Sequence, residues 1–137
     1  MSDGLVLPDL GLIVRMRGVD TGGTLTLMES AGQSPGTGPR RHVHANEDEA
    51  FFVIEGTYRW ELGAESREVE AGATIWLPRG VPHRFEVGPT GGRMLHLYTP
   101  GGIDRYFTAW QAAITSGAAD TVVPELAARY GLTYEAK

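Results

Sequence analysis

The segment PRRHVHANEDEAFFVIEGTYRWEL, from Pro39 to Leu62, decides the fold of this chain. It holds two of the four histidines of the protein, His42 and His44, one residue apart. In a β-strand, residues i and i+2 point to the same face, so the two imidazoles would project together. Two imidazoles on one face, with a carboxylate on the neighbouring strand, make a plausible site for a divalent metal. The alternative is that both are surface or core histidines without a ligand.

The overall composition excludes several classes of protein. The 137 residues are a typical length for one domain, and 42% of them are hydrophobic and 21% charged. A formal net charge of -5 argues against a partner that is nucleic acid or an anionic membrane, since both need a basic face. There is no cysteine, which excludes disulfides and thiolate ligands and suits a cytoplasmic location. We see no signal peptide, and the longest apolar run, 50–54, is too short to span a membrane.

The first hundred residues are typical of an antiparallel sandwich or barrel. Short runs of alternating apolar and polar residues are separated by glycine-rich turns. The turns include 55–56 and 88–92, and the segment 30–39 is a loop by composition. The expected strands are 12–17, 24–28, 41–44, 50–54, 57–62, 67–69, 74–77, 83–87 and 93–98.

After Pro100 the apolar period becomes helical. Six apolar residues fall on one face of a helix that ends near Gly117. They are Ile103, Tyr106, Phe107, Trp110, Ala113 and Ile114. A shorter helix is expected to start with Pro124 as its first residue and to end before Gly131. We expect both helices to pack on the outside of the barrel. The alternative is that they close the barrel mouth or form a dimer contact.

Two ordered motifs identify a family resemblance. The first consists of Gly36, His42, His44, Glu49 and Gly56, and the second of Gly72, Pro78, Gly80 and His83. Their order and spacing resemble the two signature motifs of the cupin superfamily, except that Val87 stands in place of the usual asparagine. The chain looks like a small single-domain bacterial cupin, a monocupin of the quercetin-dioxygenase-like type. The resemblance implies an all-β, jelly-roll-like barrel or sandwich over about 10–100, with a C-terminal helical extension over about 103–130, within one domain spanning 1–137.

The resemblance also implies a metal centre. His42, His44, Glu49 and His83 would hold one divalent metal per chain. Glu47 and Asp48 compete for the carboxylate role, but Glu49 keeps the family spacing to His44 and to the glycine that ends the first motif, so we expect the other two acidic residues to be solvated at a hairpin turn. Three imidazoles and a carboxylate suit iron, manganese, nickel, cobalt or zinc, and the resemblance favours iron or manganese.

Strand parity predicts the walls of a pocket. If Glu49 points inward, Phe51 and Val53 share its face, and Phe85 follows from an inward His83. This interior is apolar and partly aromatic, which favours a small apolar or aromatic substrate. The alternative is that these side chains are barrel core and touch no ligand. His96 is a candidate group behind the metal ligands or a general base, but it equally fits a strand histidine that is hydrogen-bonded in the core.

Three classes of function remain open from the sequence. The resemblance favours a metal-dependent oxygenase of the dioxygenase type, with dioxygen as a second substrate. The alternatives are a non-redox isomerase, lyase or polyketide cyclase, in which the metal acts as a Lewis acid, and a metal-containing binding protein without turnover. The family resemblance further implies a homodimer, for which the N-terminal strand and the helix face of Tyr106, Phe107 and Trp110 are the candidate interface.

Overall fold

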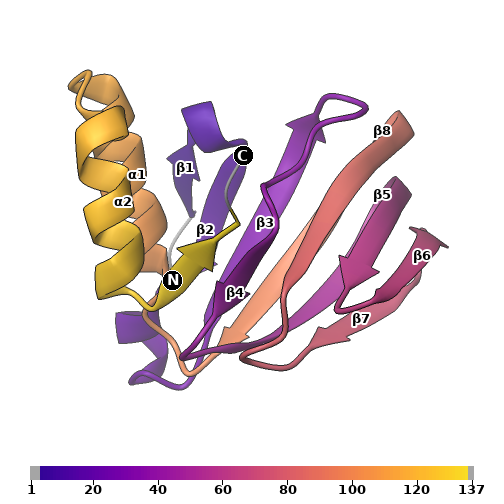
Figure 1. Cartoon of the computed structure of the whole chain (residues 1–137), viewed down its shortest axis with the longest axis horizontal. Helices are drawn as coiled ribbons and strands as arrows, with labels where there is room; N and C mark the ends of the chain where they lie inside the picture. The colour runs from indigo at the N-terminus through magenta and orange to yellow at the C-terminus, as the bar shows by residue number, and fades with distance from the viewer. Residues whose placement is uncertain (1–3, 136–137) are drawn as a thin grey trace.

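Two long antiparallel strands, β5 (Asp48–Leu62) and β8 (His83–Thr99), form the middle of the fold and pair with each other from end to end. The structure, a computed structural model, describes residues 4–135 (Figure 1). The other strands are β1 (Leu5–Leu7), β2 (Leu12–Met16), β3 (Thr26–Gln33), β4 (His42–His44), β6 (Glu65–Glu70), β7 (Thr74–Leu77) and β9 (Leu132–Tyr134). Short 3-10 turns span Pro8–Leu10 and Gly18–Thr21.

The pairing order folds the sheet over on itself. β8 pairs with three strands, β3, β4 and β5. Along one path through the sheet the strand order is β1-β2-β3-β8-β4-β9. Off this path, β6 and β7 both pair with β5. The helices α1 (Asp104–Thr115) and α2 (Ala119–Arg129) follow β8 in the chain. The predicted all-β, jelly-roll-like barrel with a short C-terminal helical extension is therefore confirmed, and every strand ladder in the described residues is antiparallel.

Alternation along β5 and β8 builds the barrel core. Because successive side chains point to opposite faces, every second residue of these strands is buried inside the barrel over most of their length. The core cluster consists of Phe51, Val53, Tyr58, Trp60, Val69, Ile75, Leu77, Phe85, Val87 and Met94. The metal-site candidates Glu49 and His83 extend the same inward rows, so the barrel core and the site share one set of strand faces.

The turns predicted at 55–56 and 88–92 are wrong, because the chain continues through both as strand. Gly56 faces Gly92 across the β5–β8 ladder, and the register shifts on both sides of Gly56. Gly56 has a φ of +76°, and a Cβ there would overlap the carbonyl oxygen of Gly91. Glycine here marks a bulge with close backbone approach, which composition alone cannot separate from a turn.

Two further element boundaries and two short strands differ from the sequence-based expectation. β3 continues to Gln33, so the loop predicted from residue 30 starts later, and the short strands β1 and β9 were not expected. α2 begins at Ala119 and contains Pro124 inside it, so the prediction that Pro124 starts this helix is wrong. The proline removes one intrahelical hydrogen bond, but burial of Leu126 and Ala127 on this helix offsets that loss.

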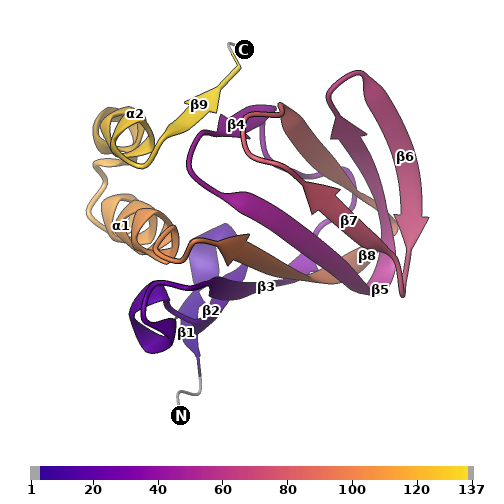
Figure 2. The ribbon, with the colours of Figure 1, turned by 90° about the horizontal axis from the view of Figure 1, so that it is seen from below.

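The two helices stand side by side at one end of the molecule, next to β1, β2 and β9 (Figures 1 and 2). They enclose a second apolar cluster against the sheet, formed by Leu7, Val14, Met28, Tyr98, Ile103, Tyr106, Leu126, Ala127 and Leu132. Asp104 anchors the start of α1, because its buried Oδ1 accepts hydrogen bonds from the Gly18 amide at 3.0 Å and the Thr26 hydroxyl at 2.8 Å. The helices thus pack outside the barrel, as expected, and residues of both also line the cavity described below, which agrees with the alternative that they close the barrel mouth. Neither described helix is long and apolar enough to cross a membrane.

The fold alters the dimer interface that the sequence suggested. Tyr106 has 0% exposure and lies within the cluster under α1, so the prediction that it forms part of an interface is wrong. The N-terminal strand that the sequence predicts is β2, where Met16 is 45% exposed, and the unexpected strand β1 beside it exposes Leu5 and Val6 at 41% and 60%, so this edge of the sheet offers apolar surface. The homodimer itself remains a proposal, which would use this edge.

Candidate metal centre

The short strand β4 brings its two histidines to a third. His42 is the Cα partner of His83 on β8, and this is the single pair between these two strands. On its other side β4 pairs with β9 along its whole length, and hydrogen bonds from the Ala45 amide to the Gly131 carbonyl and from the Glu135 amide to the Arg41 carbonyl extend that ladder. The position of β4 therefore depends on the C-terminal strand as well as on the barrel.

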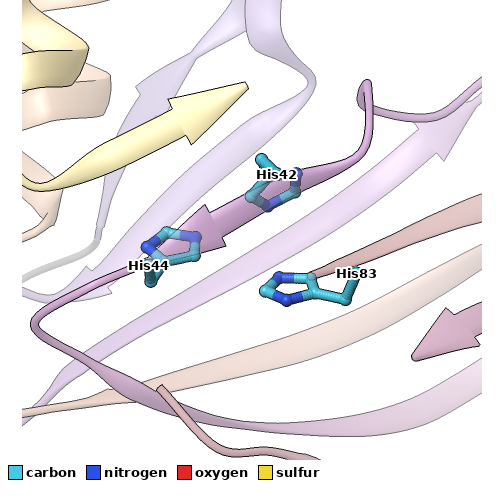
Figure 3. A group of neighbouring side chains, drawn as sticks. All are labelled: His42, His44 and His83. Carbon is cyan, nitrogen blue, oxygen red and sulfur yellow. The ribbon is translucent and has the colours of Figure 1, made fainter. Parts of the chain in front are cut away.

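The three imidazoles gather as the sequence predicted (Figure 3). Each of His42, His44 and His83 offers a ring nitrogen, and these nitrogens lie within 4.8 Å of one another. The ring centroids of His42 and His83 are 4.4 Å apart, and those of His42 and His44 are 5.2 Å apart. His44 and His83 are buried and His42 is half-buried. One divalent ion can contact all three nitrogens after small side-chain adjustments.

Glu49 of β5 completes the group. Its Oε1 lies 2.8 Å from Nε2 of His44, and its Oε2 lies 3.6 Å from Nε2 of His83. The side chain is 2% exposed. Nε2 of His83 is nevertheless a buried atom without a hydrogen-bond partner among the described residues, and the close contact of Oε1 of Glu49 with His44 lacks the alignment of a hydrogen bond. Buried polar atoms are rarely left unpaired, so this donor set fits a missing metal ion.

Each ring is held by its other nitrogen. Nδ1 of His42 lies 2.6 Å from the Arg40 carbonyl, and Nδ1 of His83 lies 3.0 Å from the Val81 carbonyl. A carbonyl oxygen only accepts, so Nδ1 carries the proton in both rings and Nε2 keeps its lone pair. Nδ1 of His44 faces Glu47 in the same way, at 3.4 Å. Such outer contacts fix the tautomer and orientation of metal-binding histidines.

The other two carboxylates of the segment 47–49 behave differently from each other. Glu47 is 8% exposed and contacts His44, so the prediction that it is solvated at a turn is wrong. Asp48 is half-buried and pairs with Arg79, whose NH2 group lies 3.0 Å from Oδ2 of Asp48. The choice of Glu49 over its neighbours therefore agrees with the geometry, since Glu49 alone faces two imidazoles.

The electrostatics of the group set His42 and His44 apart. Burial would lower the pKa of His44, but the carboxylates of Glu47 and Glu49 outweigh it and raise that pKa to about 9. Burial, together with the neighbouring histidines, lowers the pKa of His42 to about 3. Without a metal, the group thus holds one imidazolium between two carboxylates, and a metal that binds Nε2 of His44 would displace that proton.

A cavity of about 1190 Å³ opens from this group. Phe51, Phe85 and Trp60 line its barrel end, as does Tyr98, while Val53 is buried in the core cluster and is not among the lining residues. Parity alone thus placed Phe51 and Phe85 at the cavity but could not separate the cavity wall from the core behind it. Tyr134 of β9 and the helix residues Phe107 and Trp110 also line the cavity, and no local sequence signal placed them there.

His96 points into the barrel and lines the cavity. Its Nε2 lies 2.9 Å from the Ser30 hydroxyl, and its ring centroid is 4.5 Å from that of Phe51. Burial lowers the pKa of His96 to about 3. The imidazole is therefore neutral at pH 7 and a weak base, which favours a role in contacting or orienting a ligand over one in proton abstraction.

The neutral His96 has a consequence for stability in acid. Its pKa is about 6.5 in an unfolded chain and about 3 in the folded one, so below about pH 6.5 the unfolded state binds a proton that the folded state does not. We expect this residue to remove about 1.4 kcal/mol of unfolding free energy per pH unit, or about 2 kcal/mol by about pH 5. Urea unfolding of metal-free wild type and His96→Leu would measure it. An identical pH slope for the two proteins would contradict the assignment.

Comparisons with known proteins agree with the fold. Residues 32–98 match the family model described as a cupin domain. An uncharacterized protein of Streptomyces coelicolor is 32% identical over 65 residues, which cover 47% of this chain and 61% of that protein, less than two thirds of its length.

Solved structures give the same result. KdgF from Halomonas sp. aligns with a TM-score of 0.62 at 18% identity, covering 76% of this chain and 91% of that one, a likeness of fold. The polyketide cyclase RemF from Streptomyces resistomycificus aligns with a TM-score of 0.50 at 27% identity, covering 64% of each chain.

Proposed function

We propose that this chain is a member of the cupin superfamily, which the family match and the solved structures support. We further propose that it is a metal-dependent enzyme acting on a largely apolar or aromatic substrate. His42, His44, His83 and Glu49 would hold one divalent metal, with iron or manganese as the first choice. We put an oxygenase of the dioxygenase type first. Such a reaction adds both atoms of dioxygen to the substrate, so it needs no external reductant.

The observation that carries this proposal is the continuity of the cavity with the candidate ligands. Aromatic side chains of the barrel, Phe51, Trp60 and Phe85, line the same cavity as the three histidines and Glu49. When bound, the metal would supply a Lewis acid for a substrate oxygen and, if redox-active, a route for electrons to dioxygen. An apolar wall next to such a centre supports a substrate with a polar oxygen on an aromatic or aliphatic frame.

Residues of the chain would contribute binding, orientation and exclusion of water. The aromatic wall would hold the substrate frame and keep bulk water from the reacting atoms. Trp60 is 2% exposed, so its indole ring would contribute an apolar part of this wall. His96, held by Ser30, would contact the substrate as a neutral donor or acceptor.

A second candidate is a non-redox metalloenzyme, such as a polyketide cyclase, isomerase or lyase. The likeness to the polyketide cyclase RemF, at 27% identity, favours it. The same four ligands would serve it, because a metal that polarises a carbonyl requires no change of oxidation state. A metal-containing binding protein without turnover is the outcome that remains if neither activity is found.

Oxygen consumption separates the two enzyme candidates. We expect protein loaded with Fe²⁺ or Mn²⁺ to consume about one O₂ per molecule of a flavonol or other aromatic enediol converted, because a dioxygenase incorporates both oxygen atoms. The control is His83→Ala under the same loading, which should lose the activity. Conversion of an aromatic polyketide-like ketone by the zinc-loaded protein, without oxygen uptake, would instead support the non-redox candidate and contradict the oxygenase.

A further inference from the structure

We infer that the cavity contains a second, apolar subsite built by the C-terminal helices, and that the substrate is an extended amphipathic molecule with an oxygen-bearing head and an uncharged apolar body. The oxygen-bearing head is inferred from the proposed function, whereas the apolar body is inferred from the cavity alone. We call this subsite the helical annex; it consists of Leu10, Leu12, Phe107, Trp110, Val123 and Ala127.

The size of the cavity is the first reason. At about 1190 Å³ it lies above the range of roughly 300–1,000 Å³ of typical small-molecule sites. A single aromatic ring beside the histidines would leave much of this space unfilled. The sequence-based expectation of a small substrate is therefore replaced by an extended one, whose length reaches beyond the barrel interior.

The helix α1 leaves part of its apolar face for the cavity. Ile103, Tyr106 and Ala113 on this face are buried against the protein, whereas Phe107 and Trp110 on the same face are only partly buried and line the cavity. A surface helix normally turns its whole apolar stripe to the core. Here the edge of the stripe borders the cavity, so an apolar body lying there would remove further apolar surface from water.

The charges around the cavity argue that this body is uncharged. The charged residues that line it are Asp9, Arg40, Glu49 and, without a metal, His44, which like Glu49 belongs to the candidate metal centre. Asp9 is hydrogen-bonded to Gln111 of α1 through both its amide and its carboxylate. Arg40 donates to the carbonyl of Glu135, with its guanidinium 5.6 Å from the ring centroid of Tyr134. The helical annex itself offers no charged side chain.

The annex is held in place before any ligand arrives. Asp104 ties the first turn of α1 to the barrel, and the Tyr106 and Tyr134 hydroxyls are 2.9 Å apart, which links α1 to β9. The hydrogen bonds between Asp9 and Gln111 tie the middle of the helix to the N-terminal segment. Binding an apolar body there requires little ordering of the protein, and this favours affinity.

Chain-length dependence of binding tests the annex. The probes are straight-chain alkyl hydroxamic acids of about two to twelve carbons with Mn²⁺-loaded protein, and 1-alkanols of the same lengths with metal-free protein. Burial of each added methylene is worth about 0.8 kcal/mol, so we expect Kd to fall by about 4-fold per methylene until the annex is full. Calorimetry, or quenching of the intrinsic tryptophan fluorescence, to which Trp60 and Trp110 in the cavity wall contribute, would give the Kd values.

Two matched substitutions localise the effect. Ala128 and Ala112 are both exposed helix residues, but Ala128 lines the cavity and Ala112 does not. We expect Ala128→Phe to flatten the dependence on chain length and Ala112→Phe to leave it unchanged. Trp110→Ala, which removes a wall of the annex, should weaken the binding of long probes more than that of short ones.

The outcomes separate the annex from the metal centre. Affinity that is independent of chain length in both series, or equal slopes for Ala128→Phe and Ala112→Phe, would overturn the annex. Hydroxamates that bind no better with Mn²⁺ than without it would count against the proposed metal function. The alkanol series on metal-free protein would still decide the annex in that case.

Discussion

Replacing His44 with alanine should reduce the affinity of the protein for a divalent metal by more than about 100-fold. Loss of contacts behind the ligands of a metal site already costs about 10- to 100-fold, so loss of a ligand should exceed this. His44 also lies between Glu47 and Glu49, at 3.4 Å and 2.8 Å. Titration of metal-free protein with Mn²⁺ or Zn²⁺, followed by calorimetry, measures the affinity, and circular dichroism confirms that the barrel stays folded.

A control and a second variant keep this test decisive. Asp48→Asn is the matched control, because Asp48 neighbours the same group but pairs with Arg79, and it should bind metal like the wild type. Removing His44 leaves two buried carboxylates without their cation, which could unfold the protein. His42→Ala avoids this, because His42 contacts no carboxylate in the described structure and its ring is half-buried. Full metal content in a folded His42→Ala or His44→Ala protein would show that the ligand assignment is wrong.

Replacing Gly56 with alanine should lower the unfolding free energy by about 3 kcal/mol or more. Two effects add: an alanine at a φ of +76° costs about 1–2 kcal/mol, and its Cβ would overlap the Gly91 carbonyl oxygen and force the β5–β8 crossing apart. At this chain length the melting temperature should fall by about 10 °C. Differential scanning calorimetry of the metal-free protein measures the change.

Gly72 provides the matched control for the steric part. It also has a positive φ, of +93°, but no atom lies within 4 Å of the place where its Cβ would stand. Gly72→Ala should therefore cost only the backbone preference, about 1–2 kcal/mol. Equal destabilisation by the two substitutions would show that the close approach of Gly56 to β8 does not constrain the barrel.

The gathering of His42 and His44 could be predicted from the sequence for a local geometrical reason. Neighbouring side chains on one strand face are fixed by the period of two, so His42 and His44 had to project together if residues 42–44 form a strand. The second motif then brought His83 opposite His42 on β8. The alternation of apolar and polar side chains along the strands also predicts the barrel core and the inward direction of Phe51 and Phe85. Such alternation depends only on residues that are close in the sequence.

Features that depend on distant contacts were missed or misread. Glu47 was expected in solvent, since nothing nearby in the sequence shows that it folds back onto His44. Composition predicts a turn at Gly56 where the structure has a bulge, because a glycine that permits close backbone approach looks the same in sequence as one that permits a turn. β9 has only three residues, too few for a periodic pattern, although it pairs with the strand of His42 and His44.

The most direct test of a metal centre formed by His42, His44, His83 and Glu49 is elemental analysis of the wild-type protein, purified without an affinity tag or a chelator. We expect about one equivalent of a single divalent metal per chain, with iron or manganese first, because four converging ligands of this kind bind one ion. The same measurement on His44→Ala should give almost none. A wild-type protein that holds no metal, even after incubation with iron, manganese, nickel, cobalt and zinc in turn, would contradict the metal centre.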